Sequence, residues 1–298
     1  MFAVMGVVWG VPYLLIKVAV RDISPPELVF GRTLIGSCIL LPIAGHRGEL
    51  RKIVPFWRPL AAYTCAELAV PWLLLSDAER RLPSSLTGLL VAAVPFAGAV
   101  IGRLTGQPPL GRARLAGLAI GIAGVAVLLG LDLHGAHPLS LVEVAVVVVG
   151  YALGPSIAAH KLSDAPSLAV VASSLALCCL VYAPWVLTHL PSHPPHAGPI
   201  AAVAGLGVLC TSIAFVVFFQ LIAEVGPSRA LVITYVNPAI AVLLGVALLN
   251  ESFGWSAAVG FVLILCGSYV STTGGKRTDG PRPVASAVGS PERAGAGG

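Results

Sequence analysis

Five ionisable side chains interrupt long apolar stretches of the sequence: Lys17, Arg32, Glu67, Glu143 and Glu251. A charge at mid-depth in a bilayer costs roughly 3 kcal/mol or more unless it pairs or reaches the surface, so each of these residues is a functional candidate by default. Such groups can bind a charged solute, carry a proton, or pair with one another to hold the fold. The first question is which of these tasks each residue performs.

Glu67 lies midway along the apolar stretch 58–76, with Tyr63 one helical turn before it and Pro71 one turn after it. All three share one helical face. A carboxyl group at this depth could bind a proton in one conformation and release it in another, or bind a cationic solute. It could equally be a structural partner of Arg32, and the sequence favours that interpretation slightly.

Lys17 follows Trp9 and Tyr13 at spacings of four residues, so an ammonium and two aromatic rings share one face of the first helix. This face could contact a solute. Lys17 is also close to the end of its apolar stretch, where it could reach lipid headgroups and complement the helix dipole, which is the favoured interpretation.

Arg32 stands near the start of the second apolar stretch, close to the outer surface, where reaching the membrane surface or pairing with Glu67 or Glu143 is favoured over contact with a solute. Glu143 begins the sixth stretch and fits a carboxylate at a helix start. Glu251 follows the ninth stretch and is expected at the membrane interface.

Tyr235, Asn237 and Pro238 form a second candidate group. A proline inside a helix has no N–H to donate, so Pro238 would free the carbonyl of Thr234 beside a phenol and an amide. Pro95 holds the equivalent place in the first half. The alternative, which is slightly favoured, is that both prolines only bend their helices.

Thr211, Phe215 and Phe219 lie on one stripe of the eighth apolar stretch, with Gln220 towards one end. Aromatic residues at helical spacing usually pack in a core, and this interpretation is favoured over the lining of a cavity.

Metal, cofactor and enzyme chemistry have little support. The histidines of one proline-rich loop could hold a metal but fit a solvated loop better, and the six cysteines lie inside apolar stretches without the spacing of a zinc site. Neither a glycine-rich phosphate loop nor a convincing Ser-His-Asp arrangement is present. We predict no cofactor, no metal and no catalytic residues. The residues concerned are His189, His193, His196, Cys38, Cys65, Cys178, Cys179, Cys210 and Cys266.

The composition is that of a membrane protein. Hydrophobic residues make up 57% of the 298 residues, charged residues only 10%, and the mean hydropathy is +0.92, whereas soluble domains carry about 25% charged residues. A net charge of +5 is spread over short loops, which argues against nucleic-acid binding. We predict an all-α membrane protein with ten transmembrane helices, at roughly 1–20, 28–44, 58–76, 84–102, 114–131, 141–160, 166–188, 199–223, 229–249 and 255–273.

The distribution of Lys and Arg predicts the orientation. With a cytoplasmic amino terminus, the inside segments hold 13 of these residues and the outside loops hold 3. Both termini are therefore predicted in the cytoplasm, with the chain in the cell (inner) membrane. Residues 274–298 lack apolar periodicity and are predicted to form a disordered tail. The first stretch begins at Met1 itself, which suggests a longer natural amino terminus.

A weak internal repeat divides the chain. Pro95 and Pro238 are each followed by glycines 22 and 29 residues later, and each is preceded by a serine ten residues earlier, Ser85 and Ser228. Each half contains five apolar stretches, and an odd-numbered repeat must insert upside down. Inverted repeats give one bundle two related packings open to opposite sides, which is the basis of alternating access.

The order of several short motifs resembles the drug/metabolite transporter superfamily, and within it the EamA-like permeases. The resemblance implies two five-helix repeats, residues 1–131 and 141–273, and export or exchange of metabolites, amino acids or toxic compounds. One departure is Gly106-Gln107, where the family usually has Gly-Glu. The motifs are Trp9-Gly10, Lys17, Phe30, Arg32, Leu221, Gly226-Pro227-Ser228-Arg229-Ala230, Tyr235-Val236-Asn237-Pro238, Gly245 and Asn250-Glu251.

We therefore expect a secondary transporter that works as an exporter, with a small-molecule substrate and the lipid bilayer as its partners. A monomer and a homodimer both fit the sequence. The competing interpretations are an accessory or scaffold subunit of a membrane assembly and, less favoured, a membrane enzyme that modifies lipids.

Overall fold

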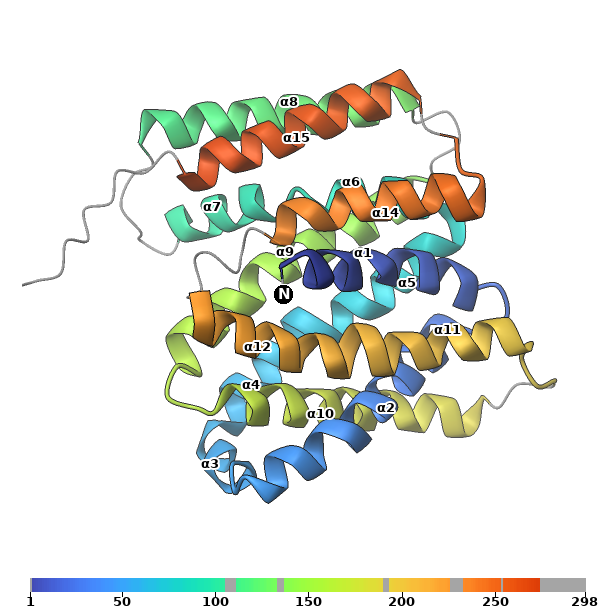
Figure 1. Cartoon of the computed structure of the whole chain (residues 1–298), viewed down its shortest axis with the longest axis vertical. Helices are drawn as coiled ribbons and strands as arrows, with labels where there is room; N and C mark the ends of the chain where they lie inside the picture. Colours follow the sequence, from blue (N-terminus) through green and yellow to red (C-terminus); the bar gives the residue numbers. More distant parts are fainter. Residues whose placement is uncertain are drawn as a thin grey trace, which may run out of the picture.

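The computed structural model describes residues 2–104, 111–132, 137–189, 193–225, 233–252 and 254–273. Every secondary-structure element in these residues is a helix. The helices lie side by side, and the connections between them gather at two opposite edges of the molecule (Figure 1).

The first half of the chain begins with two long helices that are joined by a short corner. The corner Ser24-Pro25-Pro26-Glu27 starts the second helix, because the Glu27 carboxylate accepts hydrogen bonds from the Ser24 amide at 2.8 Å and the Ser24 hydroxyl at 2.6 Å. The elements are α1 (Phe2–Ala19), α2 (Pro25–His46), α3 (Leu50–Ile53), η1 (Val54–Phe56), α4 (Trp57–Tyr63), η2 (Thr64–Ala69), α5 (Val70–Arg81), α6 (Ser84–Val91), α7 (Val94–Leu104) and α8 (Arg112–Asp132).

The second half follows the same order of long and interrupted helices. Its elements are α9 (Pro138–Lys161), α10 (Ser167–Thr188), α11 (Ala197–Gly207), η3 (Val208–Ile213), α12 (Ala214–Val225), α14 (Ile233–Leu249) and α15 (Trp255–Thr273).

Six helical segments are long and apolar enough to cross a membrane: Pro25–His46, Leu50–Arg81, Ser84–Leu104, Pro138–Lys161, Ser167–Thr188 and Ala197–Phe218. Four further apolar helices are shorter over the described residues: Val4–Ala19, Leu115–Val127, Val236–Leu249 and Trp255–Gly267. The prediction of an all-helical membrane protein is confirmed, whereas a count of ten crossings stays a prediction.

The sequence placed the end of the third stretch too early. The prediction ends the stretch at residue 76, but the helix continues to Arg81. The added residues include Glu79 and three further charged residues, Asp77, Arg80 and Arg81. The last turn is polar, so its helical state is invisible to hydropathy. The fourth stretch is divided into α6 and α7 by a turn at Ala92 and Ala93.

Each half contains a six-residue π-helix in the middle of its interrupted long segment, η2 in the first half and η3 in the second. In η3 the hydroxyls of Thr211 and Ser212 donate to carbonyls five residues earlier, Leu206 and Gly207, at 2.8 Å each. π-Helical turns are rare and are found frequently at functional sites.

The packing pairs helices of one half with helices of the other. At the edges, α8 packs on α15 and α2 packs on α10; in between, α1 contacts α11 and α14, while α9 contacts α5 and α7 (Figure 1). The two halves make equivalent contacts: α1 of the first half contacts α11 and α14 of the second, and α9 of the second half contacts α5 and α7 of the first. In this comparison α1 corresponds to α9, α5 to α11 and α7 to α14.

Glycines allow the α8–α15 pair to approach closely. A Cβ atom on Gly124 would lie 2.8 Å from the Ile264 amide and 2.9 Å from the Gly260 carbonyl, and one on Gly267 would meet Gly117 and Gly121. Close backbone contact through small residues is typical of helix pairs in membranes. The glycines of the sequence repeat therefore meet in a single helix contact.

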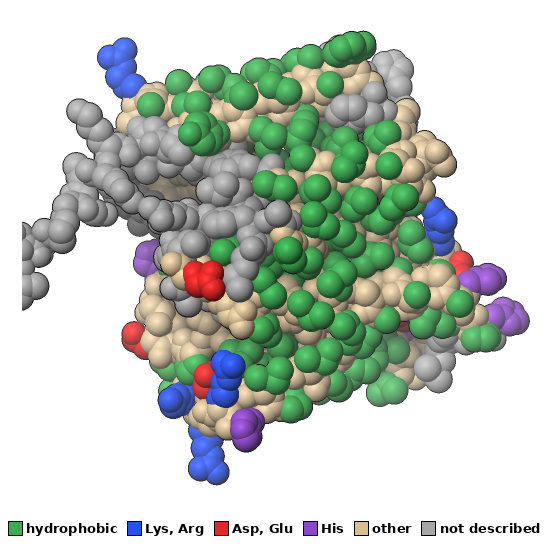
Figure 2. All heavy atoms as spheres, in the orientation of Figure 1, with side chains coloured by type: hydrophobic (Ala, Val, Ile, Leu, Met, Phe, Trp, Pro, Cys, Tyr) green, Lys and Arg blue, Asp and Glu red, His purple; other side chains and the backbone are tan. Residues whose placement is uncertain are grey.

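The visible surface is a broad apolar band, with charged side chains gathered towards its edges (Figure 2). Exposed large apolar side chains of the described residues include Leu180, Val181, Val246 and Val262. An extended apolar surface of this kind fits contact with lipid.

Candidate functional site

A buried arginine joins the two halves of the chain near the middle of the bundle. Arg32 of α2 is only 6% exposed. Its Nε donates to the Thr211 hydroxyl of η3 at 2.9 Å, and its guanidinium carbon lies 3.5 Å from the centre of the Trp72 ring. This guanidinium is fixed both along one edge and across one face.

Glu67 lies on η2, and its side chain packs against Gly154 of α9. Its Oε2 atom is shielded from solvent and has no hydrogen-bond partner among the described residues. Tyr63, one turn earlier, is buried. Tyr151 of α9 is within electrostatic range of both Glu67 and Arg32.

Glu79 was missed by the sequence analysis. It is completely buried, and both of its carboxylate oxygens lack a hydrogen-bond partner among the described residues. The signal that could have revealed it is its place one helical turn beyond the apparent end of an apolar stretch, because helices often continue past the point where hydropathy falls.

Lys17 binds the end of the helix that carries Glu79. Its half-buried ammonium donates to the backbone carbonyls of Glu79 at 2.6 Å and Leu82 at 2.8 Å. These carbonyls end α5, where the helix dipole favours a positive charge. Lys17 therefore connects α1 to the corner between α5 and α6.

Glu251 holds the other side of the same corner. Its two carboxylate oxygens accept the backbone amides of Ser84 at 2.7 Å and Ser85 at 2.9 Å, which begin α6. Burial raises the pKa of this carboxyl, but the hydrogen bonds from Ser85 and Ser84 outweigh burial and hold the pKa of Glu251 below its usual range. The ammonium of Lys17 thus caps the carboxyl end of α5, and the carboxylate of Glu251 caps the amino end of α6.

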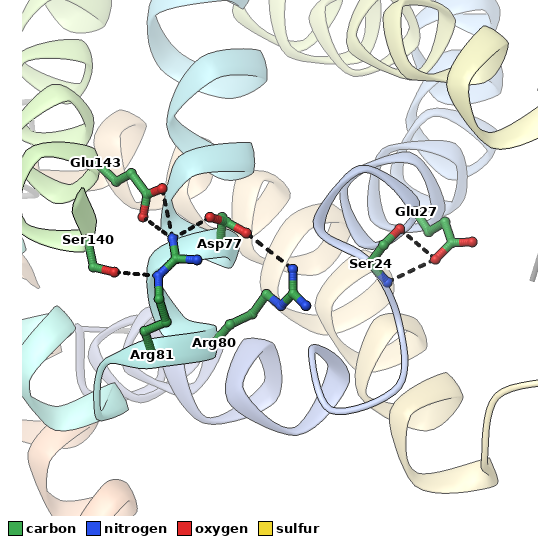
Figure 3. A network of polar contacts seen from close by, with 7 residues as sticks. All are labelled: Ser24, Glu27, Asp77, Arg80, Arg81, Ser140 and Glu143. Atoms are coloured by element: carbon green, nitrogen blue, oxygen red, sulfur yellow. Dashed lines mark hydrogen bonds and ion pairs between the residues drawn. The ribbon is translucent and has the colours of Figure 1, made fainter. Parts of the chain in front are cut away.

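Arg81 forms an ion-pair network beside this corner (Figure 3). It donates to both oxygens of Glu143 at 2.9 Å, to the Ser140 hydroxyl at 2.8 Å and to Asp77. The expectation that Glu143 pairs with Arg32 is wrong, because the unrecognised extension of α5 to residue 81 brings a closer arginine.

The other expected partner of Arg32 also differs from the contacts in the structure. In the part of the chain that the structure describes, Arg32 bonds Thr211 and stacks on Trp72, and no ion pair joins it to Glu67. The side chain that Arg32 reaches is thus a hydroxyl from the opposite half.

The predicted aromatic residues are divided between two places. Tyr13 is buried and packs against α6 at Gly88. Trp9 instead contacts Phe215 and Phe218, with ring centres 6.1 and 4.6 Å apart, and closes a separate cluster with Met5 and Leu221.

The remaining candidates are less well defined. Gln220 is exposed, and Asn237 is partly buried in α14, with its carbonyl against Gly10 of α1. Pro238 is buried inside α14, while Pro95 lies at the second residue of α7, after the break. The side chains of Phe219 and Tyr235 lie outside the described residues.

The histidines of the loop before α11 have separate contacts. His196 bonds Asp22, which holds the pKa of that aspartate below its usual range, and His189 stacks on Trp185 at 3.9 Å. Among the described residues, no three His, Cys, Asp or Glu side chains gather as they would around a metal ion.

The sequence ranges that form these helices match a known protein family. The EamA-like transporter family matches residues 1–130 and again residues 140–273. The chain belongs to the EamA-like transporter family. It is a multi-pass membrane protein, and the resemblance predicted from its motifs is confirmed.

Several relatives of this EamA-like chain are named as transporters. An uncharacterized inner membrane transporter, YedA of Escherichia coli K12, is 28% identical over 89% of each chain. A probable terminal-alkyne amino-acid exporter of Streptantibioticus cattleyicolor is 26% identical over 95% of each chain. One solved crystal structure, 22% identical, shares the fold with a TM-score of 0.66 over 91% of this chain and 94% of that chain.

Proposed function

We propose that this chain is a secondary transporter that exports small organic solutes by alternating access. Its two halves, residues 1–131 and 141–273, act as inverted five-helix repeats with ten crossings in total. The double family match, the exchangeable central contacts and the π-helix in each half support this arrangement. The names of the relatives support transport, and one of them supports amino acids among the candidate solutes.

The observation that carries the proposal is a set of buried charges without ion-pair partners. Arg32 and Glu79 are buried, Glu67 is partly buried with its Oε2 atom shielded, and none of the three forms an ion pair with another described residue. Charges inside membrane proteins are expensive and mark solute or ion pathways. In an accessory subunit, nothing would offset the free-energy cost of burying these charges.

Within this proposal, Glu67 couples transport to protons. Its unbonded oxygen lies between the two halves, against α9, where a change of packing would alter its exposure. Both termini face the cytoplasm of an inner membrane, as the basic residues predict.

Proton-driven flux in proteoliposomes tests this proposal. We expect a pH gradient to drive flux of at least one solute from a panel of amino acids, nucleosides and lipophilic cations. Glu67→Gln should abolish the pH-driven part, and the matched control Glu224→Gln, at an exposed glutamate of α12, should not. Full pH-driven flux in Glu67→Gln would remove the coupling role, and absence of flux for every solute would contradict transport.

A further inference from the structure

The guanidinium of Arg32 is held on two sides, by Thr211 along one edge and by Trp72 across one face. Thr211 gives its own proton to the Leu206 carbonyl at 2.8 Å, so its lone pair is directed to Arg32 Nε at 2.9 Å. Trp72 covers one face at 3.5 Å. The two terminal Nη amines make no hydrogen bond to the described residues. They present the paired N–H groups that match a carboxylate.

No described carboxylate neutralises this charge. Glu143 is bonded to Arg81 and Glu251 to the start of α6. Both oxygens of Glu79 and the Oε2 atom of Glu67 are without a hydrogen-bond partner among the described residues, and no ion pair joins either residue to Arg32. An uncompensated guanidinium in a core is costly, and the cost falls when an anion forms good hydrogen bonds with it. An added anion that bonds the Nη groups would therefore lower this cost.

The surroundings of the guanidinium come from both halves of the chain. Trp72 belongs to the first half and Thr211 to the second, while Tyr13 and Tyr151 are near enough to interact electrostatically with Arg32. A ligand at this place would contact both halves at once. A change in their packing would therefore change its binding.

We propose that Arg32 binds the carboxylate of the transported solute, with Thr211 and Trp72 as positioning residues that fix the guanidinium. This inference rests on the proposed function and names the substrate class: organic acids with a free carboxylate, amino acids included. The bidentate fork of an arginine suits this planar anion better than a point charge would.

The test compares solutes that differ only at the carboxylate. Thermal unfolding of the purified protein is titrated with single amino acids and short monocarboxylates, and with the primary amide of each. We expect the wild type to bind the acids roughly ten- to a hundredfold more tightly than the amides, the range for hydrogen bonds to a charged group.

Three variants separate binding from folding. Arg32→Gln should abolish the preference for acids, Arg32→Lys should keep part of it because the charge remains, and Thr211→Val should weaken acid binding about fivefold by the loss of one hydrogen bond. Arg81→Gln, a control at an exposed arginine that bonds Glu143, should lower stability and keep the preference.

Each outcome decides the inference. Loss of the acid preference in Arg32→Gln supports it, as does a reduced preference in Arg32→Lys and Thr211→Val where Arg32→Gln does not fold. An acid preference that is undiminished in all variants that fold overturns it. Flux of neutral or cationic solutes without any acid preference also overturns it and leaves the transporter proposal intact, whereas absence of flux for every solute contradicts both.

Discussion

Residues that look alike in the sequence have different roles in the structure. Glu79 and Glu143 are both buried glutamates at the α5–α6 end of the bundle, yet Glu143 accepts two hydrogen bonds from Arg81 and Glu79 accepts none from the described residues. Burial of a charge is stabilising only when partners satisfy it.

We predict opposite effects on stability from two matched substitutions. Glu143→Gln should lower the free energy of unfolding by about 1–3 kcal/mol, because it breaks hydrogen bonds to a charged group. Glu79→Gln should leave stability unchanged or raise it, since no hydrogen bond is lost. Chemical unfolding in detergent measures both. A loss of stability in Glu79→Gln as large as that in Glu143→Gln would show that Glu79 has a partner the structure does not reveal.

The sequence located most charged residues of the site but few of their contacts. Arg32, Glu67 and Lys17 stand out because apolar residues surround them. Their partners could not be derived, because Thr211 lies 179 residues from Arg32 and a hydroxyl carries no signal of this kind. Glu79 was not among the predicted candidates, because the hydropathy falls before its helix ends.

At the scale of elements, the corner between α5 and α6 is held by charges that match both helix dipoles. Lys17 donates to the last carbonyls of α5, and Glu251 accepts the first amides of α6. The long helices were predictable from apolar length. The π-helices and the break at Ala92 were not, because they depend on close packing and local backbone bonding rather than on hydropathy.

The cap on α6 predicts a defined dependence on pH. The pKa of Glu251 is lower in the folded protein than in the unfolded chain, so its stabilising effect is complete above the unfolded value of about 4.3 and is lost as the pH falls through the folded value. The difference in melting temperature between the wild type and Glu251→Gln should therefore be largest near neutral pH and shrink in acid. A difference that grows on acidification would contradict the cap.

At the scale of the whole molecule, several bonds between the halves gather at the α5–α6 end. Arg81 reaches Glu143, Glu251 reaches Ser84, and Asp22 reaches His196. Polar bonds between the two halves are therefore concentrated at this end, and under the proposed alternating access they are the contacts that would have to break for this end to open.

The orientation is testable by labelling in intact cells. In a background without cysteine, His193→Cys should react with an impermeant maleimide added outside, because its loop lies at the end that the basic residues avoid. Lys276→Cys should react only after the cells are permeabilised. The reverse pattern would show that the count of basic residues gives the wrong orientation.

The most direct test of the account is solute counterflow in proteoliposomes that contain only this protein. Vesicles loaded with an unlabelled organic acid are diluted into a trace of the labelled acid. Alternating access predicts transient accumulation of label above equilibrium, and its loss in Arg32→Gln. Label that only equilibrates would indicate a channel or leak, and label that does not enter for any tested solute would contradict a transporter.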